Sequence, residues 1–144
     1  LVFKTSNSLS GPNEAMRINQ AGGVGVGTSS IPAGYKMVVD GKVGFREAYV
    51  KLSGAWPDYV FSGNYKLKSL NELRNYLSLN QHLPGMPNAA KIESDGQNLG
   101  EIQRLQQEKI EELYLYIIEM NEILNNIRKE NKILMNEIKK CQTE

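Results

Sequence analysis

Side chains that could perform catalysis or bind a metal ion are scarce in this chain. His82 is the only histidine, Cys141 is the only cysteine, and no cysteine or carboxylate stands at ligand spacing around His82. We therefore expect no metal site and no disulfide within one chain, and we interpret His82 as a turn or helix-end residue. Residues 22–27 are rich in glycine but lack the helix and lysine signature of a phosphate loop. The sequence predicts neither an enzyme nor a cofactor.

The residues with the clearest pattern indicate association instead. With Ile110 at heptad position a, the a and d positions hold Ile110, Leu113, Ile117, Met120, Leu124, Ile127, Asn131, Leu134, Ile138 and Cys141. We call this row the seam. Its polar exception, Asn131 at an a position, is of the type that fixes register and strand number. Because no domain follows this helix in the sequence, we expect the seam to be buried against copies of the same chain.

Upstream of Ile110 the heptad pattern is less regular. Gln103 and Gln106 fall on the projected a and d positions, whereas Ile102 and Leu105 lie one position away. This offset predicts a shift of register before Ile110, which would bring the two apolar residues into the seam.

Length and charge set limits on the kind of protein. The chain has 144 residues and a formal net charge of +1, which predicts no nucleic-acid partner and no attraction to an anionic membrane. No signal peptide and no apolar run long enough to cross a bilayer is present, so we expect no membrane insertion. The first residue is Leu1 rather than methionine, which suggests a fragment of a longer protein.

Residues 1–52 alternate short apolar runs with Gly, Asn, Ser and Pro, a pattern typical of short strands. The expected strands are 1–5, 15–19, 24–28, 35–39 and 43–52, with a turn signal at Asp40-Gly41 between the last two. The alternating glycines and valines of residues 22–27 indicate close backbone approach or positive φ. Such short strands cannot bury both faces alone, so we expect several chains to intertwine here.

Residues 53–98 are predicted to form a small mixed α/β cap. Residues 56–61 include four large apolar side chains, Trp56, Tyr59, Val60 and Phe61, which we interpret as an anchoring cluster, in the core or between subunits. Ser69 and Glu72 form a capping box that begins a helix through Leu79, and 89–93 are expected to form one helical turn.

Residues 99–144 are predicted to form one long helix. Extra apolar residues at 114–118 widen the stripe, so we expect the first half of the helix to pack against the cap and the second half to stand free. The acidic pair Glu111 and Glu112 is interpreted as a solvated flank. The fold class is thus α+β: an intertwined trimeric β-rich fibre end, a small α/β cap and a long trimeric coiled coil.

Two parts of the chain resemble known families. Residues 14–41 resemble a recurrent element of phage tail-fibre proteins and related bacterial surface fibres. Residues 65–100, with the long helix after them, are similar to the endosialidase-type intramolecular chaperone domains at the C-terminus of tail fibres. The resemblance is carried by residues 14–18, 23–28, 32, 35–41, 65–70, 82–85 and 96–100.

This resemblance implies a homotrimer in a virion tail fibre or on an extracellular cell surface. In that family the terminal domain brings three chains into register so that the shaft can fold. The a and d residues do not by themselves decide between two and three strands, because Ile at a with Leu at d also suits dimers. The number three therefore depends on the resemblance and on the intertwined pattern of residues 1–52.

The resemblance also leaves two alternatives open. Some family members cleave themselves at a serine followed by aspartate with the help of a lysine. The nearest match here is Ser62, followed by Lys66 and Lys68, but Gly63 replaces the aspartate. Fibre tips also bind a receptor or glycan, and Trp56, Tyr59 and Phe61 would then form a stacking platform. Quenching of Trp56 fluorescence by sugars would distinguish such a platform from an anchor.

Overall fold

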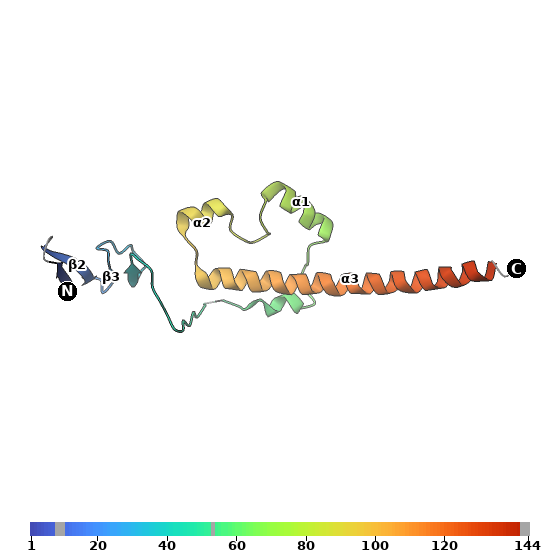
Figure 1. Ribbon diagram of the computed structural model, residues 1–144, viewed down its shortest axis with the longest axis horizontal. Helices are drawn as coiled ribbons and strands as arrows, with labels where there is room; N and C mark the ends of the chain where they lie inside the picture. Colours follow the sequence, from blue (N-terminus) through green and yellow to red (C-terminus); the bar gives the residue numbers. More distant parts are fainter. Residues whose placement is uncertain (8–10, 53, 142–144) are drawn as a thin grey trace. The chain divides into compact units, whose positions relative to one another are not determined.

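The computed structural model describes residues 1–7, 11–52 and 54–141, and these form two compact units, Leu1–Tyr49 and Val50–Glu144 (Figure 1). Residues 53 and 142–144, at the ends of the predicted cap and helix, lie outside the described residues. The cap and the long helix expected from the sequence therefore belong to one unit. The secondary structure is mixed α+β, with a four-stranded sheet and one long helix near the C-terminus.

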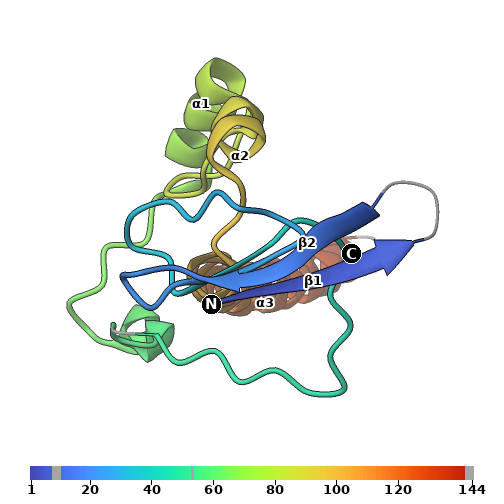
Figure 2. The same cartoon turned by 90° about the vertical axis from the view of Figure 1, so that its left-hand side faces the viewer.

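The first unit is a sheet in the order β1-β2-β3-β4. Strands β1 (Val2–Asn7) and β2 (Gly11–Ile18) pair antiparallel, as Figure 2 shows, and β2 pairs antiparallel with β3 (Val24–Val26). Strand β4 (Met37–Val39) adds parallel to β3. These four strands lie where four of the five predicted strands were expected.

The register of this sheet separates its side chains sharply by face. Phe3 pairs with Met16, Met16 with Val26, and Val26 with Val39, so these four side chains share one face. Residues two positions away in each strand extend the row on that face. Beyond the register shift at Phe3/Lys4 this row continues with polar residues, Thr5 paired with Asn13. Its apolar members are Leu1, Phe3, Met16, Ile18, Val24, Val26, Met37 and Val39. We call this set the apolar face.

Glycines allow a loop to close over the opposite face. A Cβ at Gly25 would lie 2.4 Å from the carbonyl oxygen of Thr28, and one at Gly23 would lie 3.0 Å from Cγ2 of Ile31. Gly22 and Gly27 have φ of 76° and 70°, values that L side chains rarely adopt. The predicted close approach and positive φ of residues 22–27 are both confirmed.

The fifth predicted strand is wrong. Residues 43–52 have no regular secondary structure, and 43–51 are exposed. Asp40 and Gly41 form a bend after β4, but no returning strand follows them. A strand is stabilised by hydrogen bonds to a neighbouring strand, and a single chain offers this apolar segment no such neighbour.

The second unit begins with three short helical elements. The 3₁₀ helix η1 (Pro57–Phe61) precedes α1 (Leu70–Asn80), which starts with the predicted capping box of Ser69 and Glu72. Helix α2 (Ala89–Asp95) extends two residues beyond the single turn expected, and the Asn88 side chain caps its start by accepting the Lys91 N–H. Neither α1 nor α2 contains a buried residue.

Helix α3 (Leu99–Cys141) spans 43 residues and organises this unit. The buried apolar side chains of the described residues are Val60, Ile102, Leu105 and Tyr116, besides the buried ring of Pro57. All of them lie on η1 or on the first half of α3, and Figure 1 shows η1 running along α3. The expected packing of this half of the helix against the preceding segment is confirmed.

Candidate functional site

The first half of α3 is enclosed on one side by the segment that precedes α1. Gly100 lies directly against this segment, because a Cβ there would approach Cδ2 of Leu52 to 2.6 Å and Cγ1 of Val50 to 2.9 Å. Farther along, Pro57 and Val60 are buried on η1, and Val60 is only 2% exposed. A spacing of three residues places Pro57 and Val60 on the same side of a 3₁₀ helix, so η1 is attached through that side.

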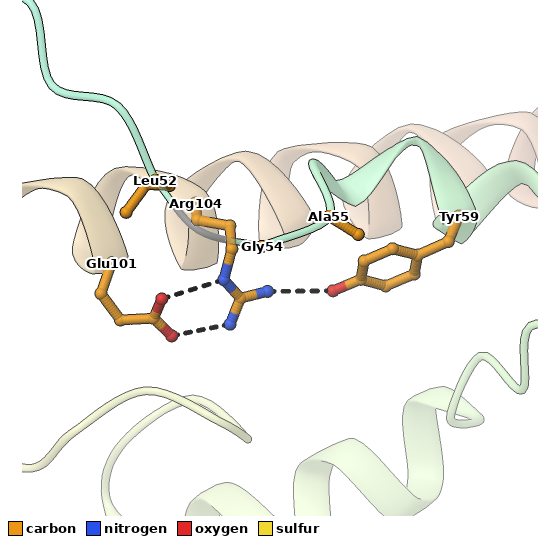
Figure 3. A pocket seen from close by; sticks show the side chains of 6 residues that line it. All are labelled: Leu52, Gly54, Ala55, Tyr59, Glu101 and Arg104. Carbon is orange, nitrogen blue, oxygen red and sulfur yellow. Dashed lines mark hydrogen bonds and ion pairs between the residues drawn. The ribbon is translucent and has the colours of Figure 1, made fainter.

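Polar contacts between η1 and α3 also fix the orientation of η1. Tyr59 donates a hydrogen bond to Glu108. It also accepts one of 3.1 Å from Nη1 of Arg104, whose Nη2 pairs with Glu101 at 2.7 Å (Figure 3). A cavity of about 270 Å³ lies here, and it is lined by Tyr59, Glu101 and Arg104 together with Leu52, Gly54 and Ala55. The charged residues in the wall of this cavity, Arg104 and Glu101, therefore already form an ion pair with each other.

A second set of contacts encloses the next side of α3. Tyr65 donates a hydrogen bond to Glu112, and the buried Tyr116 donates one of 2.6 Å to the carbonyl oxygen of Lys68. Lys109 Nζ lies 2.9 Å from both Glu108 and Glu112. The chain from residue 50 to residue 68 thus follows α3 while moving around its circumference.

The electrostatics of these contacts favour the packed state near neutral pH. Burial raises the pKa of Tyr65, and its hydrogen bond to Glu112 raises it further. Burial alone would raise the pKa of Glu108, but hydrogen bonds from Tyr59 and Lys109 overcome that effect and lower it. Both shifts stabilise the form that makes the hydrogen bond, a neutral phenol facing an ionised carboxylate.

The seam is the sector of this half-helix that its own chain leaves open. Of residues 100–117, all described, the exposed ones are Gln103, Gln106, Ile110, Leu113, Tyr114 and Ile117. Apart from Tyr114 they follow one another at alternating steps of three and four, which is the a/d spacing. Every other residue in this stretch is buried or half-buried.

The upstream offset of the heptad now has a simple explanation. Ile102 and Leu105 are 7% and 8% exposed and belong to the core of the single chain. Gln103 and Gln106 remain exposed on the line of the seam. No shift of register is needed, because the two apolar residues are buried elsewhere and the two glutamines continue the heptad.

Beyond Ile117 the helix has no cover from its own chain. Residues 118–141 are all exposed, which includes Met120, Leu124, Ile127, Asn131, Leu134 and Ile138 of the seam. Cys141 is a free, exposed thiol. The structure thus presents the predicted association residues along one line of α3, and in the first half on the one sector that is free.

The other candidate residues lie apart from the seam. Within the predicted anchoring cluster the buried residues are Val60 and the neighbouring Pro57, whereas Trp56 and Phe61 are exposed at the two ends of η1. Anchoring of the exposed members to another subunit stays a prediction. Ser62 caps η1 through its backbone, and its N–H donates to the carbonyl oxygen of Tyr59.

Lys66 and Lys68 line a different cavity, of about 220 Å³, whose lining does not include Ser62. Tyr65, Glu108, Lys109, Glu112 and Tyr116 also contribute to its wall. No hydrogen bond joins the Ser62 side chain to either lysine in the described part of the chain. The three residues that could support cleavage are therefore not assembled into one site.

His82 follows the end of α1, where its Nδ1 donates a hydrogen bond of 3.0 Å to the carbonyl oxygen of Leu83 and its ring packs edge-on against the ring of Tyr76. This agrees with the helix-end position predicted for it. Within residues 1–7, 11–52 and 54–141, no three His, Cys, Asp or Glu side chains gather closely enough to hold a metal ion. In the same residues no helix has the length and apolar character needed to cross a bilayer.

Glu111 is a site residue that the sequence reasoning assigned wrongly. It is 4% exposed rather than solvated, with Oε1 accepting a hydrogen bond of 2.9 Å from Gln107 and Oε2 lacking a hydrogen-bond partner. Glu112 is half-buried and bonded to Tyr65 and Lys109. The only local signal was Gln107 one turn before Glu111, because the cover itself comes from distant residues.

Comparison with protein-family models, with curated proteins and with solved structures finds no match for this chain.

Proposed function

We propose that this chain is a self-association module, which joins three copies through the seam of α3 and brings a fibre protein into register as it folds. The observation that carries this proposal is the selective exposure of the seam. Over residues 100–117 the exposed side chains are the line of Gln103, Gln106, Ile110, Leu113 and Ile117, with Tyr114 beside it, and every other residue is buried or half-buried. From Ile110 onward this line is apolar, and in the first half of α3 most of the other residues are covered. An exposed apolar line of this kind indicates a binding partner.

The energetics favour another copy of the chain as that partner. Each large apolar side chain of the seam gains roughly 1.5–3 kcal/mol when it is buried. Identical helices supply the same heptad to one another, so a parallel assembly places Asn131 opposite Asn131 and each apolar layer opposite itself. The gain is offset by the ordering of side chains and by lost translational freedom, but it is repeated along eight apolar positions.

Three strands, the fibre context and a location on a virion or an extracellular surface are supported by the sequence resemblance described above. The module would act as an intramolecular chaperone: α3 assembles from local structure, and the slower pairing of strands follows. No catalytic step is part of this proposal.

A matched pair of adjacent substitutions tests it. Ile117 and Ile118 are 56% and 53% exposed in one chain, but only Ile117 lies on the seam. We expect native mass spectrometry to find three chains for the wild type and for Ile118→Asp, and single chains for Ile117→Asp at micromolar concentration. The reason is that a buried carboxylate on the seam would have no partner.

The outcomes separate the parts of the proposal. Single chains of the wild type, or equal effects of the two substitutions, would overturn self-association through the seam. A wild-type dimer that only Ile117→Asp dissociates would retain the seam and remove the trimer.

A further inference from the structure

The apolar face of the sheet is a second surface, which the first unit does not cover with residues of its own. All eight of its residues are apolar, and the register carries them across all four strands. Leu1, Phe3 and Met37 are exposed, and the other five are half-buried. In the described part of this unit the buried positions are Gly23 and Gly25, so the unit has no apolar core of its own.

The opposite face of the sheet differs in composition and cover. Ile31 packs over Gly23 and Gly25 there, and Arg17 forms a two-pronged ion pair with Glu14. The hydrogen bond from Arg17 lowers the pKa of Glu14, which therefore stays ionised on this side. The opposite face is thus charged and covered at its glycines, whereas the apolar face carries no charged side chain.

We infer that the apolar face packs against the same face of the other copies in the assembly. This inference rests on the proposed function, since the seam is what would bring the copies together. Identical faces without a charged side chain can meet without burying a charge or placing like charges in contact. A charged or polar partner would gain nothing from such a surface.

The face is as large as the largest apolar patch of a typical monomer, a kind of patch that is often functional. Leu1, Phe3 and Met37 alone expose on the order of 300 Å², taking roughly 200 Å² for each large side chain. With the half-buried residues between them, the face reaches the range of about 300–600 Å² of the largest apolar patch on a typical monomer. A stable interface buries roughly 800 Å² per partner, so this face needs the seam as a second interface between the same copies.

This second interface would make the sheet dependent on assembly. A sheet whose apolar side chains have no cover within the chain cannot repay the entropy of ordering its strands. Joining the copies through α3 raises the effective concentration of the other sheets to about millimolar. The strands would then become stable only after the helices have assembled.

Two neighbouring residues of β1 provide the test. Phe3 on the apolar face and Val2 on the opposite face are 48% and 45% exposed in one chain, so a single chain would tolerate a polar residue equally at both. Phe3→Gln, Val2→Gln and the wild type are compared in the full chain by native mass spectrometry and by hydrogen exchange of the β2, β3 and β4 amides.

We expect all three proteins to have the same oligomer mass, because the seam is intact. Exchange in the strands of Phe3→Gln should be faster by roughly ten- to a hundredfold, the factor for losing one buried large apolar side chain, while Val2→Gln should match the wild type. The dissociated Ile117→Asp chain should lose strand protection as well.

Other results overturn the inference and identify the alternative. Equal exchange in Phe3→Gln and Val2→Gln, with wild-type mass, would mean that copies do not cover the face and that a different partner or solvent does. Full strand protection in dissociated Ile117→Asp would mean that the sheet needs no copies. A wild type of single chains would instead overturn the proposed function itself.

Discussion

The two halves of α3 share one heptad pattern but differ in what surrounds them. Residues 99–117 are enclosed by η1 and by the contacts of Tyr65 and Lys68, and residues 118–141 are exposed all round. In the first half the exposure of the seam is selective, since neighbouring residues on every other side are covered. In the second half exposure does not distinguish the seam, and the spacing of apolar residues is the only indication.

This difference shows where each half obtains its stability. Val60, Ile102, Leu105 and Tyr116 give the first half a small core within one chain. The second half has none, and most helical stability in proteins comes from packing of an apolar face. The first half can therefore form within one chain, whereas the second half depends on association.

The largest effect on this contrast is expected from Val60→Ala, which removes the attachment of η1. Loss of two methyl groups from a side chain that is 2% exposed should lower the free energy of unfolding by roughly 2 kcal/mol. Urea unfolding followed by the fluorescence of Trp56, next to η1, measures this. The matched change Val43→Ala, in an exposed irregular segment, should stay within about 0.5 kcal/mol.

Val60→Ala should leave the oligomer mass unchanged, because the seam is not altered. Equal losses for Val60→Ala and Val43→Ala would mean that η1 does not stabilise the first half, and the contrast between the halves would fail.

A smaller effect is expected in the second half from Asn131→Ile. Replacing a polar residue on a buried seam should stabilise the assembly by roughly 1–2 kcal/mol per chain, while register or strand number becomes less uniform. Thermal unfolding and native mass spectrometry measure the two consequences. Asn125→Ile, off the seam, is the control. If mass and stability both remain as in the wild type, Asn131 does not face a partner.

The smallest effect is a pH dependence of the enclosed half. The pKa of Tyr65 is raised by burial and by Glu112, so the folded chain keeps the phenol protonated at pH values where the unfolded chain loses the proton. This contribution is complete below about pH 10, the ordinary value for tyrosine, and is lost as pH rises beyond it.

Tyr65→Phe should therefore cost about 1 kcal/mol near pH 8 and progressively less toward pH 11, as measured by thermal unfolding. The exposed Tyr35→Phe is the control and should match the wild type at every pH. A difference between wild type and Tyr65→Phe that stays constant from pH 8 to 11 would contradict the assignment.

Local residue patterns were sufficient for the helices. The capping box of Ser69 and Glu72 and the heptad of α3 act between residues that are close in sequence, and the structure has both helices at the predicted positions. Glycine positions were predictable for the same reason, because a positive φ at Gly22 and Gly27 is a property of the residue.

The sequence by itself determined which segments form α-helices, where these begin, and that α3 bears an apolar line, whereas the 3₁₀ helix η1 was not predicted. Only the tertiary structure decided which sides of α3 the chain covers, that Glu111 is buried, that residues 43–52 stay unpaired, and which strand residues meet on the apolar face. The physical reason is the range of the interactions. Caps and helical turns are satisfied within a few residues, whereas burial and strand pairing need partners that are distant in the chain or belong to another copy.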